Sequence, residues 1–398
     1  MPQEKILISG TGCALADFLY ADLRFDTEVF SGYLSRETGD GGLIPGKLVF
    51  TEEFEKFAGK PYNKVLKEIT GNRMPNAFNI GGPGLVSLIH ASQILEDQDF
   101  SVKFYGSLGN DKTAEIIVDL VQKTPLDISN YKIISNKPTS FTDVFSDPTF
   151  DNGNGERTFV NNIGAAWDYY PEMIGNNFFG SHIVSFGGTA LVPQIHDNLS
   201  FLLLKARNNG CITVVNTVFD FRNEKAYPGK PWPLGKNDES LGLIDVLIMD
   251  HEEALKISGQ QTLDNTILYF TKKQVSSFII TNGARDVIVF SDGRFFEKTG
   301  PIKFPVSRMI TEELKRNGDT TGCGDNFAGG IIASLAMQLK VRKRGQFSVK
   351  EALAMAIASG GFTCSYLGGT YLETYKGEKW AKIQNFLSDY NLQTSKTQ

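Results

Sequence analysis

The stretch 319–330 reads DTTGCGDNFAGG, and it decides the fold. Apolar residues follow it at positions 331, 332, 335 and 339, which together with Phe327 have the spacing of one helix face. A glycine-rich turn therefore leads directly into a helix. The free N–H groups and the dipole at a helix N-terminus attract anions, so this stretch predicts an anion-binding site.

The residue types in this turn suit phosphoryl transfer. Gly322 and Gly324 allow the backbone to approach a phosphate because they carry no Cβ atom. Asp325 stands at the junction of turn and helix, where a carboxylate could accept the proton of an attacking hydroxyl group. The alternative is that Asp325 only caps the helix and the glycines only form a turn. That alternative explains less well Gly329 and Gly330, each of which costs about 1 kcal/mol in a helix interior and so indicates close packing against a backbone or ligand.

Outside this stretch, short apolar runs alternate with helical patterns. The runs are apolar on both faces, as central strands of a parallel sheet are, and the helical patterns lie between them. This order predicts a three-layer α/β/α, doubly wound, mostly parallel sheet, in one domain spanning 1–398. The predicted strands are 6–8, 182–186, 212–215, 246–249 and 278–281, and the helical patterns include 197–207 and 262–273.

Two segments interrupt the alternation, at about residues 22–50 and 132–160. The first has short β-like pieces and many glycines. The second reads as a hairpin with its turn at 151–155, DNGNG. We expect both to contribute strands to a small second sheet that covers the active site as a lid.

Composition excludes several classes of protein. The net charge of −5 and the pI near 5.6 disfavour nucleic-acid binding. No run of 18 apolar residues or signal-peptide pattern is present, so we expect no membrane association. The cysteines lack metal-ligand spacing, so we interpret them as reduced thiols of a cytoplasmic protein; they are Cys13, Cys211, Cys323 and Cys364.

The stretch 319–325 resembles the second signature of the PfkB (ribokinase-like) carbohydrate kinase family, usually written D-T-x-G-A-G-D. Cys323 replaces the usual alanine. The resemblance implies a ribokinase-like fold with a small β-sheet lid and an ATP-dependent phosphotransferase activity. It also implies that Asp325 is the catalytic base and that the backbone of Gly322, Cys323 and Gly324 forms the anion hole.

Weaker resemblances along the chain imply further roles. They concern substrate binding, nucleotide binding, a Mg²⁺ ion held through water, and possibly a K⁺ ion. The residues are Asp17, Gly81, Gly82 and Arg157 for substrate; Thr281, Gly283 and Thr321 for the nucleotide; Asp250 and Glu253 for Mg²⁺; and Asp319 for the monovalent cation.

The substrate pocket matches the family less well than the catalytic turn does. Val86 stands where the family usually has an asparagine that contacts the sugar. We therefore expect a small sugar or sugar derivative as substrate, with a purine nucleoside as the alternative. Phe141, Phe145 and Phe150 could stack on a base, and the long stretch between Asp17 and Gly81 resembles the adenosine-kinase-like branch. A homodimer through the lid is a further expectation.

Two other classes of function have weaker support in the sequence. Gly10-Thr11-Gly12 follows the first strand, as in dinucleotide-binding oxidoreductases, but Leu15 occupies the place of their third glycine. The chain could also be a non-catalytic relative that binds a sugar or nucleotide. The intact Asp325 argues against that reading.

Overall fold

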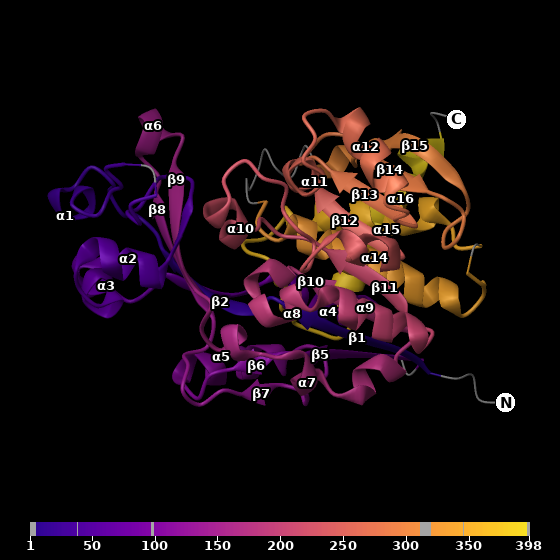
Figure 1. The fold of residues 1–398 in the computed structure, drawn as a ribbon, viewed down its shortest axis with the longest axis horizontal. Coiled ribbons are helices and arrows are strands. Elements are labelled where there is room, and N and C mark those ends of the chain that lie inside the picture. The colour runs from indigo at the N-terminus through magenta and orange to yellow at the C-terminus, as the bar shows by residue number, and fades with distance from the viewer. Residues whose placement is uncertain (1–4, 38, 97–98, 311–319, 345, 396–398) are drawn as a thin grey trace.

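The computed structural model describes residues 5–37, 39–96, 99–310, 320–344 and 346–395. An eight-stranded sheet forms its centre (Figure 1). Neighbouring strands pair in parallel from β5 to β13, and the last two are antiparallel. In spatial order they are β15 (Thr299–Phe304), β14 (Val287–Ser291), β13 (Ser277–Thr281), β12 (Val246–Asp250), β11 (Ile212–Asn216), β10 (Ile183–Gly187), β1 (Ile6–Gly12) and β5 (Phe100–Tyr105).

Helices cover both faces of this sheet. One face packs against α4 (Pro83–Ile94), α5 (Lys112–Val121), α14 (Cys323–Leu339), α15 (Val349–Thr363) and α16 (Glu378–Ser395). The other packs against α7 (Pro171–Ile174), α8 (Pro193–Asp197), α9 (Leu199–Asn208), α11 (His251–Ser258) and α12 (Leu263–Lys272). The short α10 (Phe221–Ala226) follows β11.

The alternation of side chains along each strand builds two separate cores. In β12, Ile248 belongs to the core with α14, whereas Leu247 and Met249 belong to the core with α11. A strand buried on both faces needs apolar residues at every position, and this is the pattern that the sequence shows. The predicted three-layer α/β/α fold is confirmed, and the five predicted strands coincide closely with β1, β10, β11, β12 and β13.

The paired glycines inside α14 are explained by helix packing. A Cβ atom on Gly329 would lie 2.5 Å from the Ser87 carbonyl oxygen of α4. One on Gly330 would lie 2.7 Å from the Ser359 hydroxyl of α15. The close packing predicted at these glycines is therefore with two neighbouring helices.

A five-stranded sheet stands beside the main body, on the left of Figure 1. Its strands, in order, are β3 (Leu48–Phe50), β9 (Glu156–Asn162), β8 (Phe141–Asp147), β2 (Leu15–Tyr20) and β4 (Ala77–Gly81). The chain passes from β1 into β2 and so joins the two sheets. An aromatic core covers the outer face of the small sheet beneath α1 (Glu28–Ser31), α2 (Thr51–Ala58) and α3 (Tyr62–Thr70).

The small sheet differs in extent from the two segments that the sequence indicated. Within 22–50 only β3 joins the sheet, and β2 and β4 come from outside both segments. Within 132–160, β7 (Lys132–Ile133) pairs with β6 (Ser107–Leu108) instead. The hairpin of β8 and β9 lies where it was expected, and α6 (Phe150–Gly153) falls in its turn, with Asp151 and Asn152 at positive φ.

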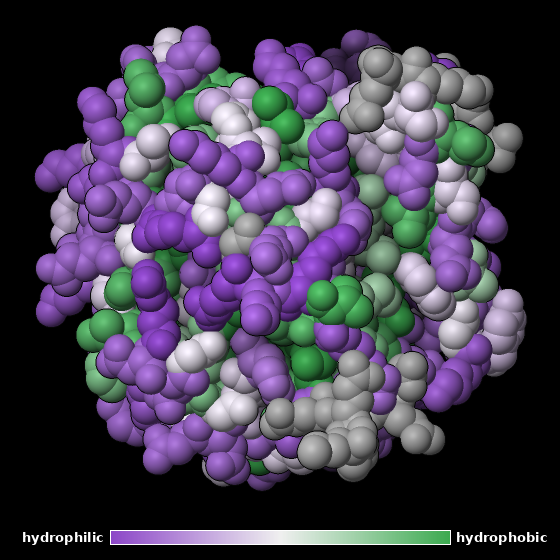
Figure 2. Space-filling view, turned by 90° about the vertical axis from the view of Figure 1, so that its right-hand side faces the viewer, coloured by the Kyte–Doolittle hydropathy of each residue, from purple (hydrophilic) through white to green (hydrophobic). Residues whose placement is uncertain are grey.

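The face of the molecule turned away from the small sheet is mainly hydrophilic, with hydrophobic residues scattered in small groups (Figure 2). Among the residues that the structure describes, no helix has the length and apolar character needed to span a membrane.

Candidate active site

The predicted anion site lies at the N-terminus of α14. Cys323 is the first helical residue, and Gly322 is the N-cap, with left-handed φ and ψ of 75° and 4°. A Cβ atom on Gly322 would lie 2.3 Å from the Gly369 Cα atom, so only glycine fits. At Gly324, by contrast, a Cβ atom would meet nothing within 4 Å. The first turn of the helix is thus open to an approaching anion.

Asp325 lies in this first turn. Asp325 as a whole is partly exposed to solvent, but the protein around its carboxylate removes most of that group's hydration. Burial raises the pKa of Asp325 to about 7. A carboxyl group with a pKa near neutral is suited to accept a proton from a hydroxyl group and to release it again.

Asp17, in β2, lies close enough to Asp325 for the two charges to interact. Burial and then the Asp325 charge raise the pKa of Asp17 to about 7, and a hydrogen bond with Thr142 opposes this rise. Gly81 makes room for the Asp17 carboxylate, because a Cβ atom there would lie 2.2 Å from Oδ2. Gly82 is the N-cap of α4. The structure therefore brings Asp17 near the predicted base, with Gly81 packed against its carboxylate and Gly82 next in the chain.

A cavity of about 1100 Å³ opens between the small sheet and the loop after α15. The predicted residues Asp17, Arg157 and Thr321 all line it. Arg157 projects from β9, and its Nη1 lies 3.4 Å from the Thr321 Oγ1 atom. The hairpin of the small sheet thus contacts the turn that leads into α14.

Asp250 and Glu253 stand at the end of β12 and the start of α11. They form a capping box, in which each carboxylate accepts a hydrogen bond from the backbone N–H of the other residue. The Glu253 carboxylate is buried and accepts a hydrogen bond from the Thr217 hydroxyl at 2.5 Å. Burial, and then the Asp250 charge, raise the pKa of Glu253 to about 7, with a smaller contribution from Asp325.

The other predicted nucleotide residues lie at the end of the next strand. Thr281 is in register with Asp250, and its hydroxyl donates to the Met249 carbonyl at 3.4 Å. Gly283 is exposed, with φ of 56° and open space around it. Neither residue lines the cavity that contains Asp17. Asp319 lies outside the described residues.

The donor groups fit a magnesium ion held through water better than a directly ligated metal. Within the described part of the chain, no group of three histidine, cysteine, aspartate or glutamate residues could hold a metal ion. The buried Glu253 carboxylate beside Asp250 is nevertheless a concentration of negative charge that a cation would stabilise. Mg²⁺ usually keeps several of its waters, which is compatible with two carboxylates and no closed cage.

The aromatic residues proposed to stack on a base are placed elsewhere. Phe145 is fully buried in the outer core of the small sheet. Phe141 packs edge-on against Phe18, and Phe150 packs at a tilted angle against Phe25. Strand alternation explains this, since odd positions of β8 point outward and Thr142, Val144 and Ser146 point into the cavity. The cavity is lined instead by residues that the sequence did not single out, including Leu48, Asn79 and Phe159.

A buried polar network behind the anion site was also missed from the sequence. Lys379 of α16 is fully buried, and its ammonium donates to Gln93 Oε1 at 3.0 Å and to Asn326 Oδ1 at 3.1 Å. The Asn326 amide donates in turn to the Gly322 and Gly369 carbonyls, at 2.9 and 2.8 Å. Burial lowers the pKa of Lys379 to about 7. No local sequence signal could identify this lysine, which lies 53 positions from its partner Asn326.

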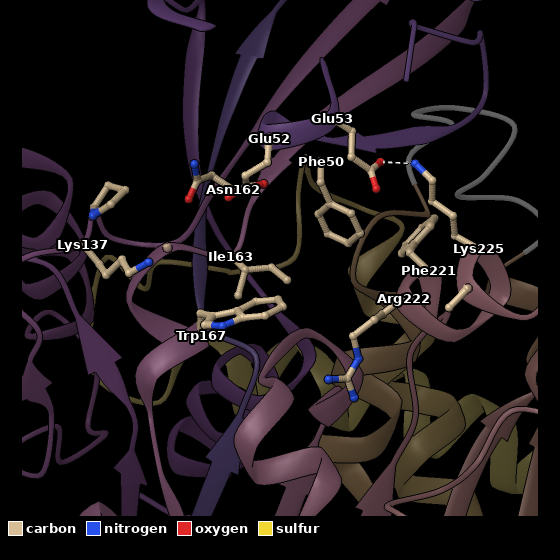
Figure 3. Close-up of a pocket in the computed structure, with 13 residues that line it drawn as sticks. Phe50, Glu52, Glu53, Lys137, Asn162, Ile163, Trp167, Phe221, Arg222 and Lys225 are labelled. Atoms are coloured by element: carbon tan, nitrogen blue, oxygen red, sulfur yellow. Dashed lines mark ion pairs between the residues drawn. The ribbon is translucent and has the colours of Figure 1, made fainter. Parts of the chain in front are cut away.

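A second hollow, of about 730 Å³, lies where the small sheet meets the main body (Figure 3). Phe50, Trp167 and Phe221 contribute aromatic walls. An ion pair of 2.5 Å joins Glu53 of α2 to Lys225 of α10 across it. This pair ties the helices of the small sheet to the main body.

Comparison with protein families gives one match. The model of the pfkB family carbohydrate kinases matches residues 67–374, and of the predicted site residues that the structure describes only Asp17 lies outside this range.

Two individual relatives have 24% and 23% of aligned residues identical to this chain. The chain is 24% identical to adenosine kinase of Schizosaccharomyces pombe over 275 residues, 65% of this chain and 74% of that protein. It is 23% identical to ribokinase of Haemophilus influenzae over 310 residues, 75% of this chain and 87% of that protein. The structure of Anopheles gambiae adenosine kinase in complex with P1,P4-di(adenosine-5) tetraphosphate superposes with a TM-score of 0.64 at 20% identity, covering 90% of this chain and 94% of that one.

Proposed function

The chain belongs to the pfkB family of carbohydrate kinases, and we propose that it transfers a phosphoryl group from ATP to a hydroxyl group of a small sugar or sugar derivative. The observation that carries this proposal is the position of Asp325. It lies at the N-terminus of α14, in a site open to anions, and its charge interacts with that of Asp17 on the small sheet. The ATP-dependent kinase activity follows from the family, and the substrate is the part that we add.

The residues of the site divide the chemistry between them. Asp17 would accept hydrogen bonds from the hydroxyl groups of the sugar and hold it in the cavity. Asp325 would take the proton of the attacking hydroxyl group. At the same time the oxygen of that hydroxyl would bond to the γ-phosphorus of ATP, and ADP would leave. The backbone N–H groups at Gly322, Cys323 and Gly324 would donate to the oxygens of the transferred group and stabilise the charge in the transition state.

The ends of β12 and β13 would hold the nucleotide and its metal. Mg²⁺ neutralises phosphate charge when it is bound. Asp250 and Glu253 would orient its waters, and Thr281, Gly283 and Thr321 would contact the nucleotide. We also propose that a K⁺ ion binds near Asp319. Turnover measured at several K⁺ concentrations and constant ionic strength tests this part of the proposal.

The small sheet would act as the lid. Phosphoryl transfer must exclude water, or ATP is hydrolysed instead. The segments 22–50 and 132–160, together with β2 and β4, would cover the cavity from one side. The contact of Arg157 with Thr321 supports closure of this lid onto the turn before α14.

A purine nucleoside is the second candidate substrate. The inner face of the lid is partly apolar, with Leu48, Val144 and Phe159 lining the cavity, and a base would bury this surface. A cavity of about 1100 Å³ is also larger than a single monosaccharide needs. The similarity to an adenosine kinase is compatible with this candidate.

A coupled assay of ADP formation tests the proposal directly. Sugars, sugar acids and nucleosides would each be offered with ATP and Mg²⁺, with Asp325→Asn as the matched inactive control. Turnover on a sugar supports the first candidate, and turnover on nucleosides alone supports the second. Binding of sugars without turnover on any acceptor would contradict both and favour a non-catalytic relative.

The site of action and the assembly state complete the proposal. We place the enzyme in the cytoplasm and keep a homodimer through the lid as a prediction. The outer face of the lid sheet is already covered by α1, α2 and α3, so such a dimer would use these helices or the sheet edges. Sedimentation equilibrium of the full chain measures the assembly state.

A further inference from the structure

Two cysteines meet at the anion site. Cys323 is the first residue of α14, and Cys364 is the C-cap residue of α15. They are 41 positions apart in the chain, yet their sulfur atoms lie 3.4 Å from each other. From the sequence, all four cysteines were interpreted as reduced thiols that lie far apart in the chain. The packing of α14 on α15 brings Cys323 and Cys364 together.

The surroundings of the pair favour reaction between the two sulfurs. The helices are in close contact, because a Cβ atom on Gly360 would lie 3.1 Å from the Cys323 carbonyl oxygen. Cys323 is half-buried and belongs to the first turn of α14, whereas Cys364 is buried. The positive end of a helix dipole stabilises a thiolate, which is the reactive form of cysteine.

We propose that Cys323 and Cys364 form a reversible intramolecular disulfide that switches off the anion site. With hydrogen peroxide as oxidant, the Cys323 thiolate attacks one oxygen, the O–O bond breaks, hydroxide leaves and takes up a proton to become water, and Cys323 becomes a sulfenic acid. The Cys364 thiol then displaces its hydroxyl group as water, so that two thiols and one peroxide give one disulfide and two waters. A dithiol reductant reverses the reaction by thiol–disulfide exchange.

The disulfide would distort the site because of where Cys323 lies. A disulfide bond is about 2.05 Å long, so the sulfurs must approach by about 1.3 Å from their present 3.4 Å. Cys323 contributes its backbone to the anion hole, and Cys364 begins the loop in which Gly369 packs against Gly322. A displacement of about 1 Å at a catalytic group can lower the rate about 100-fold, and we expect a loss of this size.

The effect on turnover rests on the proposed kinase function, whereas formation of the disulfide does not. The test therefore uses diamide, a thiol-specific two-electron oxidant, on the full chain and reads peptide mass and turnover separately. Trypsin cleaves after Arg316, Lys340, Lys350 and Lys376, so the disulfide would join the peptides 317–340 and 351–376. We expect this linked pair, an approximately 100-fold loss of turnover, and recovery of both with dithiothreitol.

Two single-cysteine variants make the result specific. Cys364→Ala should keep its turnover after diamide, because the second thiol is missing. Cys211→Ala removes a buried cysteine that bonds to the Phe179 carbonyl, and it should remain as sensitive as the unmodified chain. The proposal is overturned if the linked peptides do not form, if they form while turnover is unchanged, or if Cys364→Ala is inactivated equally. A reduced protein that phosphorylates no acceptor would contradict the proposed function instead, and weaker ATP binding on oxidation would still report the switch.

Discussion

The anion site and the lid are built in opposite ways. Residues 320–325 are consecutive, and they reach their places as soon as the turn and the first turn of α14 form. The lid draws strands from four separate parts of the chain, with Asp17 and Arg157 140 positions apart on the same cavity wall. The groups proposed for catalysis are therefore local in sequence, whereas the groups proposed to bind substrate come together only when distant segments pair.

The largest expected effect is at the local site. Asp325→Asn should lower kcat by about 10²- to 10⁴-fold, because the amide cannot accept the proton of the attacking hydroxyl. Binding of ATP, measured by calorimetry, should persist, since the N–H groups of the turn are unchanged. Near-normal kcat in this variant would show that Asp325 is not the catalytic base.

Lys379→Met tests whether the local site needs distant support. The variant removes the ammonium that holds Asn326, and through it the Gly322 carbonyl, so we expect kcat to fall about 10-fold or more while KM for the acceptor changes little. Lys379→Arg should recover part of the activity. If both variants lose thermal stability without any change in kcat, Lys379 has only a structural role.

Arg157→Ala tests the lid. Loss of the contact with Thr321 and of a cation in the cavity should raise KM for the acceptor about 10-fold and leave kcat less affected. Arg24→Ala, which removes an exposed arginine of the lid that pairs with Asp26, is the matched control and should change neither KM nor kcat.

Bound substrate should also slow hydrogen exchange in 22–50 and 132–160 together. Exchange that ignores substrate in these segments would show that they are not the lid.

The smallest effect concerns stability where the two regions meet. In the folded protein the pKa of Asp17 is raised from 3.8 to about 7, so an ionised Asp17 destabilises the unliganded fold. The stabilising contribution of the protonated form is therefore lost as the pH rises towards and through 7. At pH 8 the free energy of unfolding of Asp17→Asn should exceed that of the unmodified chain by on the order of 1–2 kcal/mol, with a smaller difference at pH 5. Thermal unfolding at the two pH values measures this difference. A gap that is equal at both pH values would contradict the raised pKa of Asp17, which burial and then the Asp325 charge produce.

Part of the fold was readable because its signals are periodic and short in range. The doubly apolar runs predicted β1, β10, β11, β12 and β13, since only a strand between two helix layers needs apolar residues on both faces. The lid was harder to delimit. Its strands carry an aromatic core on one face and a mixture of polar and apolar side chains on the other, and the partner of each strand is set by contacts with residues far along the chain.

The sequence by itself determined the glycine turn, the helix that follows it and the position of Asp325, because a few adjacent residues define a turn and a helix N-terminus. Only the tertiary structure decided that Asp17 lies near enough to Asp325 for their charges to interact, that Lys379 bonds to Asn326, and that the sulfur atoms of Cys323 and Cys364 meet. Each of these pairs joins residues more than 40 positions apart. The free energy that brings them together comes from packing the helix layers on the sheet, and no local pattern in the sequence records it.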